Sequence, residues 1–269
     1  MPLSPDFIIG LRLALRARFF LITLWLLIAL AAIVLMASQF SGRQPATVAL
    51  DIGISVIRLT LPLVIIMLVQ ELLTREFDRR YFLTSLTYPR PRHQLFLGRF
   101  LASFSLVLGL LSIMAILLAT LVWFIGQGYA QTTPVALDHH YWITIAFIAL
   151  DLFVITTMGA FLAIVAVTPS FILIGTFGFM LAARSFSTIV ALLGQEQQIV
   201  ENPDLYQNSL GLLGYFLPDL AALDVRMIAL YGQMDFLPSN WPALLASTTA
   251  YGLALIGLAL WFLQRKRFT

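Results

Sequence analysis

The feature that most constrains this fold is a run of twenty uncharged, largely apolar residues, Phe19–Ser38. As an α-helix rising about 1.5 Å per residue, it matches the roughly 30 Å hydrocarbon core of a bilayer. Five further apolar stretches follow it, and none shows the alternation of a barrel strand. The sequence therefore predicts an all-α polytopic membrane protein with six transmembrane helices, over residues 19–38, 50–70, 101–126, 141–167, 171–193 and 243–263.

The overall composition agrees with a bilayer as the solvent of this chain. Hydrophobic residues make up 60% and charged residues 11%, against about 45–50% and about 25% in ordinary soluble domains. No stretch between the predicted spans is long and polar enough for a soluble domain. We therefore expect residues 1–269 to form a single transmembrane domain.

The N-terminal residues 4–18 carry the signals of a short helix. Ser4-Pro5-Asp6 is typical of a helix N-terminus with proline in the first turn. Phe7, Leu11 and Leu15 then share one face, which favours a helix lying on the membrane surface, although a basic leader to the first span is the alternative. A signal peptide has an apolar region of about 7–15 residues, so residues 19–38 are interpreted as a retained helix.

The distribution of basic residues predicts the orientation. Twelve of the sixteen fall on the side that holds both termini and residues 71–100, whereas only Arg43 and Arg226 fall on the other side. Because cytoplasmic segments of membrane proteins are enriched in arginine and lysine, we expect both termini and residues 71–100 to be cytoplasmic. Residues 194–242 then form an outer region.

That outer region contains two short helical patterns around a proline. Residues 205–217 are apolar but too short to span, and Pro218-Asp219 predicts the start of a second short helix that ends at Gly232. The pattern favours a re-entrant helical hairpin between spans five and six. Irregular backbone at membrane depth must be buried in protein or line a wet cavity.

Residues 71–100 form the longest charged segment of the chain. Glu71 with Arg75, and Glu76 with Arg80, are spaced for ion pairs along a helix that continues the second span. Pro89-Arg90-Pro91 ends that helical pattern. Residues 81–92 between arginines offer a surface for a partner protein, and the alternative is a basic flank that only fixes the topology.

Three ionisable residues, Arg58, Asp151 and Arg184, lie inside predicted spans at similar depths in the outer half of the membrane. Such residues are costly and mark functional sites by default. In one interpretation Asp151 pairs with one arginine and holds helices together. In the other, an arginine faces a pathway and meets an anionic substrate group. A single aspartate cannot neutralise both arginines, so the second requires water, a lipid phosphate, Asp51 or a substrate.

Several classes of chemistry lack their residues here. The chain has no cysteine, and its only lysine, Lys266, has no glycine-rich loop before it, so a Walker-type ATP site is excluded. No hydrolase or metalloprotease motif is present. His139-His140 beside Asp138 suggests a metal site, but adjacent histidines point apart on most backbones, which argues against one. We expect no catalytic, cofactor or metal site, and no nucleic-acid-binding domain.

The chain resembles the six-span permease subunit of type-2 ABC transporters, an ATP-driven exporter family. The resemblance covers nearly the full length and rests on the order of elements and on a loose motif in residues 71–100. That motif is an acidic helix end, a leucine-containing step, a proline, a basic residue and Gly-Arg, here Glu71 and Glu76, Leu83-Thr84-Ser85-Leu86, Pro89, Arg92 and Gly98-Arg99. Phe216-Leu217-Pro218-Asp219 resembles the family's proline step. Where many members have a glycine, this chain has Tyr81 or Phe82.

The resemblance implies a translocation pathway flanked by spans two and five, and a first cytoplasmic loop that contacts a separate ATPase. The implied coupling residues are Glu71, Glu76, Arg80, Tyr81, Phe82, Leu86, Pro89 and Arg92. Two ATPase subunits holding ATP and Mg, a second copy of this permease or a similar one, and a bacterial inner membrane are also implied. A non-transporting membrane assembly factor is the main alternative. A secondary transporter is disfavoured because the chain shows no internal repeat.

Overall fold

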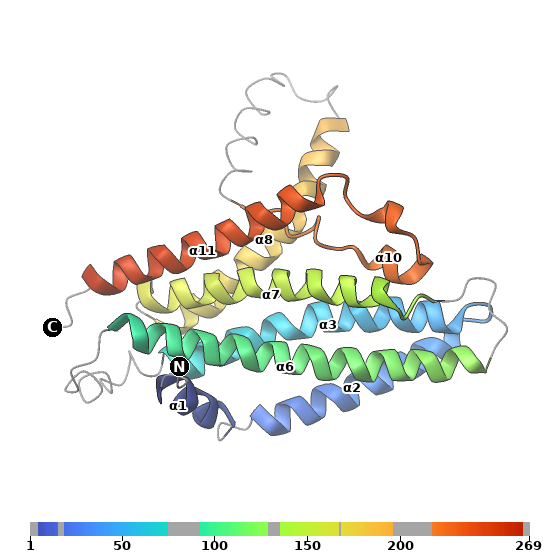
Figure 1. The fold of residues 1–269 in the computed structure, drawn as a ribbon, viewed down its shortest axis with the longest axis horizontal. Coiled ribbons are helices and arrows are strands. Elements are labelled where there is room, and N and C mark those ends of the chain that lie inside the picture. Colours follow the sequence, from blue (N-terminus) through green and yellow to red (C-terminus); the bar gives the residue numbers. More distant parts are fainter. Residues whose placement is uncertain are drawn as a thin grey trace.

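The computed structural model describes residues 5–15, 19–74, 92–128, 135–166, 168–195 and 217–265, and this part of the chain contains helices and no strands (Figure 1). Its elements are α1 Pro5–Ala14, α2 Phe20–Phe40, α3 Pro45–Val69, the π-helix η2 Gln70–Thr74, α6 Arg92–Gln127, α7 His139–Val165, α8 Pro169–Gln195, α10 Arg226–Tyr231, the 3-10 helix η3 Met234–Phe236 and α11 Trp241–Arg265.

Five helices, α2, α3 with its π-helical continuation, α6, α7 and α11, are long and apolar enough to cross a membrane, with mean hydropathies of 1.8 to 2.8. The chain is therefore a multi-pass membrane protein. The apolar part of The sixth span over residues 171–193 thus stays a prediction.

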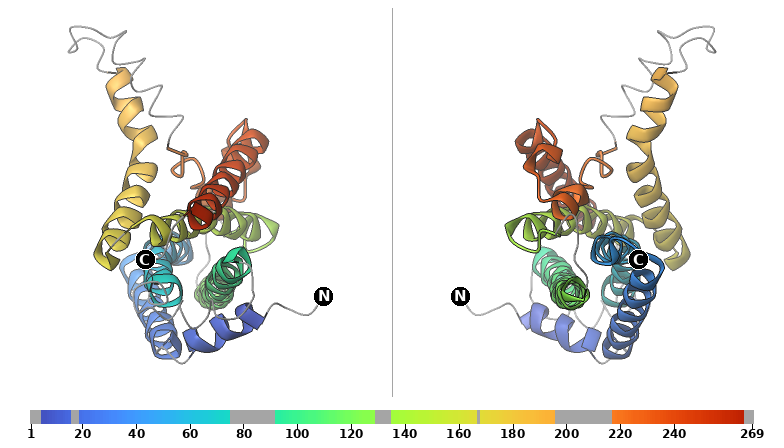
Figure 2. Two further views of the ribbon diagram at one scale, coloured as in Figure 1. Left: turned by 90° about the vertical axis from the view of Figure 1, so that its left-hand side faces the viewer. Right: turned by 90° about the vertical axis from the view of Figure 1, so that its right-hand side faces the viewer.

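The long helices share one axis, and α1 does not. In Figure 1, α2, α3, α6, α7 and α11 run lengthwise, and the first described helix and the end of α11 lie toward the same end of the bundle. Figure 2 shows α1 running across that bundle and α8 leaning away from α11. Which end faces the cytoplasm stays a prediction.

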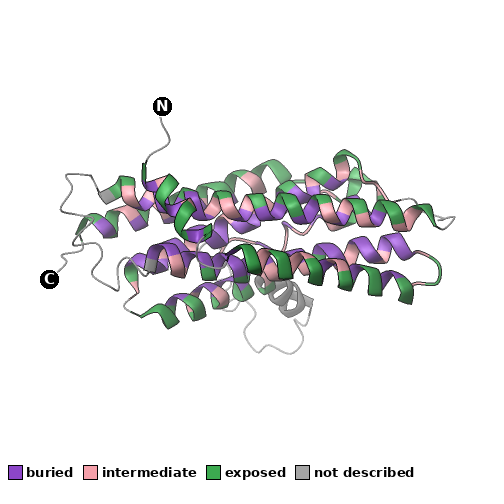
Figure 3. Ribbon diagram, turned by 90° about the horizontal axis from the view of Figure 1, so that it is seen from below, coloured by how far each residue is buried: buried purple, intermediate pink, exposed green. Residues whose placement is uncertain are grey.

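The outward faces of the helices are apolar. Trp25 and Met36 on α2 are 68% and 66% exposed, and exposed residues follow the outer sides of the helices (Figure 3). Large exposed apolar surfaces of this kind are costly in water and mark an interaction with a membrane or a partner. The buried residues line the inward sides, where they form one continuous core.

The base of the bundle is held by a close contact between α1 and α6. Asp6, Gly10 and Ala14 form the buried face of α1. A Cβ added at Gly10 would lie 2.9 Å from the Ala102 Cβ, and one at Gly98 would lie 2.8 Å from the Asp6 Cβ. Only glycine permits the two backbones to approach this closely. The predicted apolar face leaves Leu15 exposed, as expected of a helix on a membrane surface.

Helix bounds differ from the predicted spans mainly at polar ends. α6 begins at Arg92, nine residues before the predicted residue 101, because Phe96 and Phe100 pack into the core and carry the polar residues between them. α3 begins at Pro45 rather than residue 50, since proline suits the first helical position. The predicted continuation of the second span past Glu71 is confirmed as far as Thr74.

The outer region was predicted to start its second helix at Pro218-Asp219, and this is wrong. The Asp219 carboxylate accepts hydrogen bonds from the backbone N–H groups of Ala221 and Ala222, at 3.1 Å each. This Asx-type turn satisfies the local backbone and delays the helix to Arg226. The predicted end at Gly232 is confirmed, with φ of 65°. Residues 205–216, the other arm of the predicted hairpin, lie outside the described residues.

Candidate functional site

The three predicted intramembrane charges meet in space. Arg58 lies on α3, Asp151 on α7 and Arg184 on α8, and Arg184 forms an ion pair with Asp151. Asp151 is fully buried, so the pair is shielded from solvent on the carboxylate side. This settles which of the two arginines pairs with Asp151. It also ties α8 to α7 in the middle of the bundle.

A proline explains why Arg184 also reaches α3. Pro62 lies inside α3 and lacks an N–H, so the carbonyl of Arg58, four residues earlier, has no helical donor. Arg184 donates from Nη1 to that carbonyl at 2.9 Å. The guanidinium of Arg184 therefore satisfies an acceptor that Pro62 leaves open and a buried carboxylate at the same time.

Arg58 pairs with a residue that was not predicted. Its guanidinium forms an ion pair with Asp224 and donates to the backbone carbonyl of Leu220 at 3.4 Å. The expected partners were water, a lipid phosphate, Asp51 or a substrate, and none of these is the one observed. Asp224 takes that place because residues 217–232 fold back over α3.

Asp51, the expected partner of Arg58, instead binds Arg226. Arg226 Nη1 lies 3.0 Å from Asp51 Oδ1 and 2.8 Å from Ser55 Oγ, while Nη2 lies 3.4 Å from Asp224 Oδ2. Charges of opposite sign thus alternate from α3 through residues 217–232 to α8 and α7. We call this set the charge chain; its members are Asp51, Arg226, Asp224, Arg58, Arg184 and Asp151.

Backbone hydrogen bonds seat residues 217–232, here called the outer segment, against three elements. Leu220 N–H donates to the Ala183 carbonyl on α8 at 3.2 Å, and Ala136 N–H donates to the Ala229 carbonyl at 3.2 Å. The Thr144 hydroxyl on α7 lies 3.5 Å from the Val225 carbonyl. Ile228, Ala229 and Leu230 of α10 are buried. The outer segment is therefore packed against α7 and α8 as well as held by ion pairs.

A cleft of about 400 Å³ lies beside the charge chain. Its wall carries three guanidinium groups and one carboxylate. The lining residues are Ser55, Arg58, Leu59, Arg184, Ala221, Asp224 and Arg226. Ser55 and Leu59 are exposed, so the cleft opens along that side of α3. Pathway facing and helix pairing, posed as alternatives from the sequence, therefore coexist at Arg58 and Arg184.

Little of the predicted coupling surface falls within the described residues. Glu71 lies in η2 and is partly buried, and Arg92 begins α6. The remaining predicted coupling residues lie outside the described residues: Glu76, Arg80, Tyr81, Phe82, Leu86 and Pro89. Their contact with an ATPase stays a prediction.

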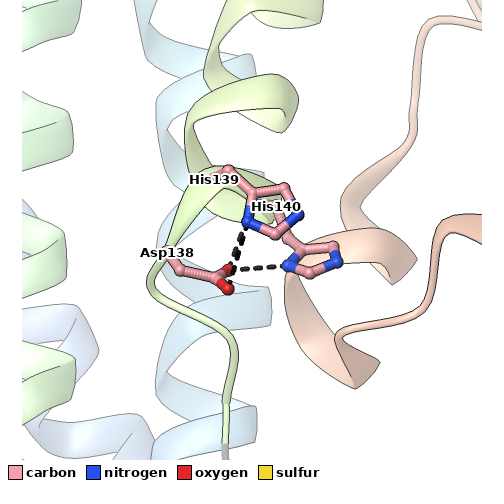
Figure 4. A group of neighbouring side chains, drawn as sticks. All are labelled: Asp138, His139 and His140. Atoms are coloured by element: carbon pink, nitrogen blue, oxygen red, sulfur yellow. Dashed lines mark hydrogen bonds and ion pairs between the residues drawn. The ribbon is translucent and has the colours of Figure 1, made fainter.

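The two adjacent histidines do not point apart as expected. His139 and His140 have ring centroids 3.8 Å apart, and both Nδ1 atoms face the Asp138 carboxylate, at 3.2 and 2.6 Å (Figure 4). Asp138 caps α7 by accepting from the His140 N–H, which brings both rings to one carboxylate. The hydrogen bond from the His140 side chain lowers the pKa of Asp138. Potential metal-ligating atoms of the three residues lie within 4.8 Å of one another.

Sequence reasoning missed Asp224 and Arg226 as members of the site. The available signal was Pro62, which leaves the Arg58 carbonyl without a donor, together with the excess of acidic residues in the outer region. A scan of protein-family models and a search of curated proteins both give no match to this chain.

Proposed function

We propose that this chain is the permease subunit of an ATP-driven exporter, which forms the pathway and is driven through residues 71–100. The observation that carries the proposal is the placement of charges along one helix. α3 holds Asp51 and Arg58 near the cleft and continues without a break into η2, which holds Glu71. Thirteen helical residues separate Arg58 from Glu71, about 20 Å at 1.5 Å per residue.

α3 is the connecting rod in this proposal. A push on residues 71–92 moves η2 and α3 together, since a continuous helix transmits displacement along its axis. Arg58 then shifts relative to Asp224 and to the Arg184 guanidinium that binds its carbonyl. The pathway lies between α3 and α8, with Arg58 and Arg184 beside it. Closing and reforming these contacts opens the outer end.

The partners follow from the same proposal. ATP and Mg bind to two separate ATPase subunits that contact Glu71, Glu76, Arg80, Tyr81, Phe82, Leu86, Pro89 and Arg92. A second copy of this chain, or a similar permease, completes the pathway. The complex lies in a bacterial inner membrane with both termini and residues 71–100 in the cytoplasm, and its sixth span is residues 171–193. Membrane lipids surround its apolar outer faces.

Co-purification tests this function. The chain is purified from its native membranes, and Mg-dependent ATPase activity is measured in the purified fraction. Arg80→Glu with Arg92→Glu should reduce that activity at least about tenfold, because reversed charges repel the surface they bind. Arg43→Glu is the matched control: it reverses an exposed arginine of the α2–α3 link and should have no effect. Equal ATPase activity in all variants, or none in the wild type, would contradict the proposal.

One observation favours a second function, a non-transporting membrane assembly factor. The charge chain balances three arginines with three aspartates, which a static scaffold requires. Such a protein needs no ATPase and no motion of α3. The same co-purification separates the two, since a scaffold retains its assembly partners after charge reversal in residues 71–92.

A further inference from the structure

We propose that the cleft beside the charge chain binds the phosphate group of an anionic membrane lipid. This proposal requires only that the chain lies in a membrane, and it does not rest on coupling to an ATPase. It concerns a cleft of about 400 Å³ between α3, the outer segment and Arg184 of α8. The occupant is identified from the charge of the cleft wall and from the apolar surface that continues from it.

The charge chain is neutral as a whole, but the wall of the cleft is not. Asp151 is fully buried and Asp51 does not line the cleft. Arg58, Arg184 and Arg226 line it against Asp224 alone, so three positive charges and one negative charge leave a net charge of two. Guanidinium groups present planar forks that match phosphate oxygens. The cleft therefore favours an anion with several oxygens.

An exposed apolar stripe leads away from the cleft along α3. Ser55, Leu59, Leu63 and Met67 recur every four residues, and the last three are 59%, 45% and 54% exposed. Leu59 also lines the cleft, and Met67 lies about 12 Å further along the helix. Leu181 on α8, one turn before Arg184, is 49% exposed. A phosphate held by the arginines places its acyl chain on this surface, whereas a soluble anion leaves the surface uncovered.

The test is a titration of the purified full chain with phosphatidylglycerol, with the bound lipid counted by native mass spectrometry. Asp51→Asn with Arg226→Gln removes one cleft arginine together with its partner outside the wall, so neither charge is left unpaired. Binding should weaken about tenfold, the size of one charge-assisted hydrogen bond in a partly exposed site. Asp224→Asn removes the only cleft carboxylate and should tighten binding severalfold.

Two controls and one competitor make the result decisive. Arg43→Gln and Asp235→Asn remove one charge of each sign from exposed positions outside the cleft and should leave binding unchanged. Glycerol phosphate, which carries the head group without acyl chains, should compete poorly. Equal binding by all variants, a shift in the same direction for both cleft variants, or equal competition by glycerol phosphate overturns the proposal. The titration contains no ATPase, so its failure leaves the co-purification result untouched, and the reverse holds too.

Discussion

The base and the outer end of this bundle are closed by different kinds of contact. At the base, α1 packs on α6 through Gly10 and Gly98, where an added Cβ would meet a neighbour at 2.8 to 2.9 Å. At the outer end, the outer segment is held over α3 by Arg58 and Arg226, which share the carboxylate of Asp224. One contact depends on the absence of side chains, and the other depends on charged side chains with more than one partner.

This difference predicts where the molecule moves. Close backbone packing has a single good arrangement, because interiors are dense and respond to small shifts in discrete steps. Ion pairs that share a carboxylate can exchange partners with little change in backbone. The base therefore acts as a fixed joint between α1 and α6, and the outer end acts as the adjustable one. Each prediction below tests one side of this comparison, in order of decreasing effect.

The largest effect is expected from breaking the buried pair that anchors the charge chain. Arg184→Met leaves the fully buried Asp151 without its partner and the Arg58 carbonyl without its donor. Removing one member of such a pair costs about 3–5 kcal/mol. Chemical unfolding followed by tryptophan fluorescence measures this loss in the free energy of unfolding.

A double variant is the control for that prediction. Arg184→Met with Asp151→Leu removes both charges, and replacing a buried pair by apolar residues is often neutral. The double variant should therefore recover most of the lost stability. Equal losses in the single and double variants would show that the two side chains are not coupled, and would remove the anchor from the charge chain.

The base should respond to a single methyl group. Gly98→Ala places a Cβ 2.8 Å from the Asp6 Cβ and 3.2 Å from the backbone of Asp6 and Phe7. Backbone atoms cannot yield as a flexible side chain does, so overpacking should cost about 1–3 kcal/mol. The measurement is the midpoint of thermal unfolding, together with labelling of a cysteine introduced at the fully buried Ala14, in a chain that has no native cysteine.

Gly109→Ala on the same helix is the matched control for this substitution. No atom lies within 4 Å of a Cβ at that position, so alanine should be neutral or slightly stabilising. Labelling at residue 14 should rise in the Gly98 variant and stay low in the Gly109 variant. If both variants behave alike, the close approach of α1 to α6 is not what holds the base together.

These two sites also show what the sequence could predict. The spans follow from apolar length alone, so α2, α3, α6, α7 and α11 were expected within a few residues at most ends. The start of α6 was missed because packing of Phe96 and Phe100 overrides the polar residues around them. Arg58, Asp151 and Arg184 could be selected because charge inside a span is rare.

The partners of those charges could not be selected from the sequence. Asp224 is separated from Arg58 by four predicted spans, and only the fold-back of the outer segment brings them together. The Asx turn at Asp219 positions that segment and also explains why the predicted helix begins late. Local patterns describe each turn correctly once it is known, but they do not state which distant helix the turn meets.

The outer end should loosen without global unfolding. Asp224→Asn removes the carboxylate shared by Arg58 and Arg226, and the partly exposed Arg226 pairs contribute less than about 1 kcal/mol each. A cysteine introduced at Ala229, which is fully buried, should label faster in this variant. About 1 M salt should speed labelling at residue 229 in the wild type, since the Debye length falls to about 3 Å, and should not speed labelling at Ala14. Faster labelling at both positions would erase the contrast between the two ends.

The smallest effect is expected at Asp138, the capping residue that begins α7 next to the outer segment. The His140 hydrogen bond lowers the pKa of Asp138 below its ordinary value of 3.8. Because the folded pKa is the lower one, the stabilisation is complete above 3.8 and is lost as the pH falls through the folded value. Asp138→Asn keeps a good capping residue without the titratable charge, so its thermal midpoint should lose this acid-side decline. The difference in midpoint between wild type and variant is measured at pH 7 and near pH 3. A difference that does not change with pH would mean that Asp138 acts through its cap geometry alone, and that the outer end owes its adjustability to the charge chain.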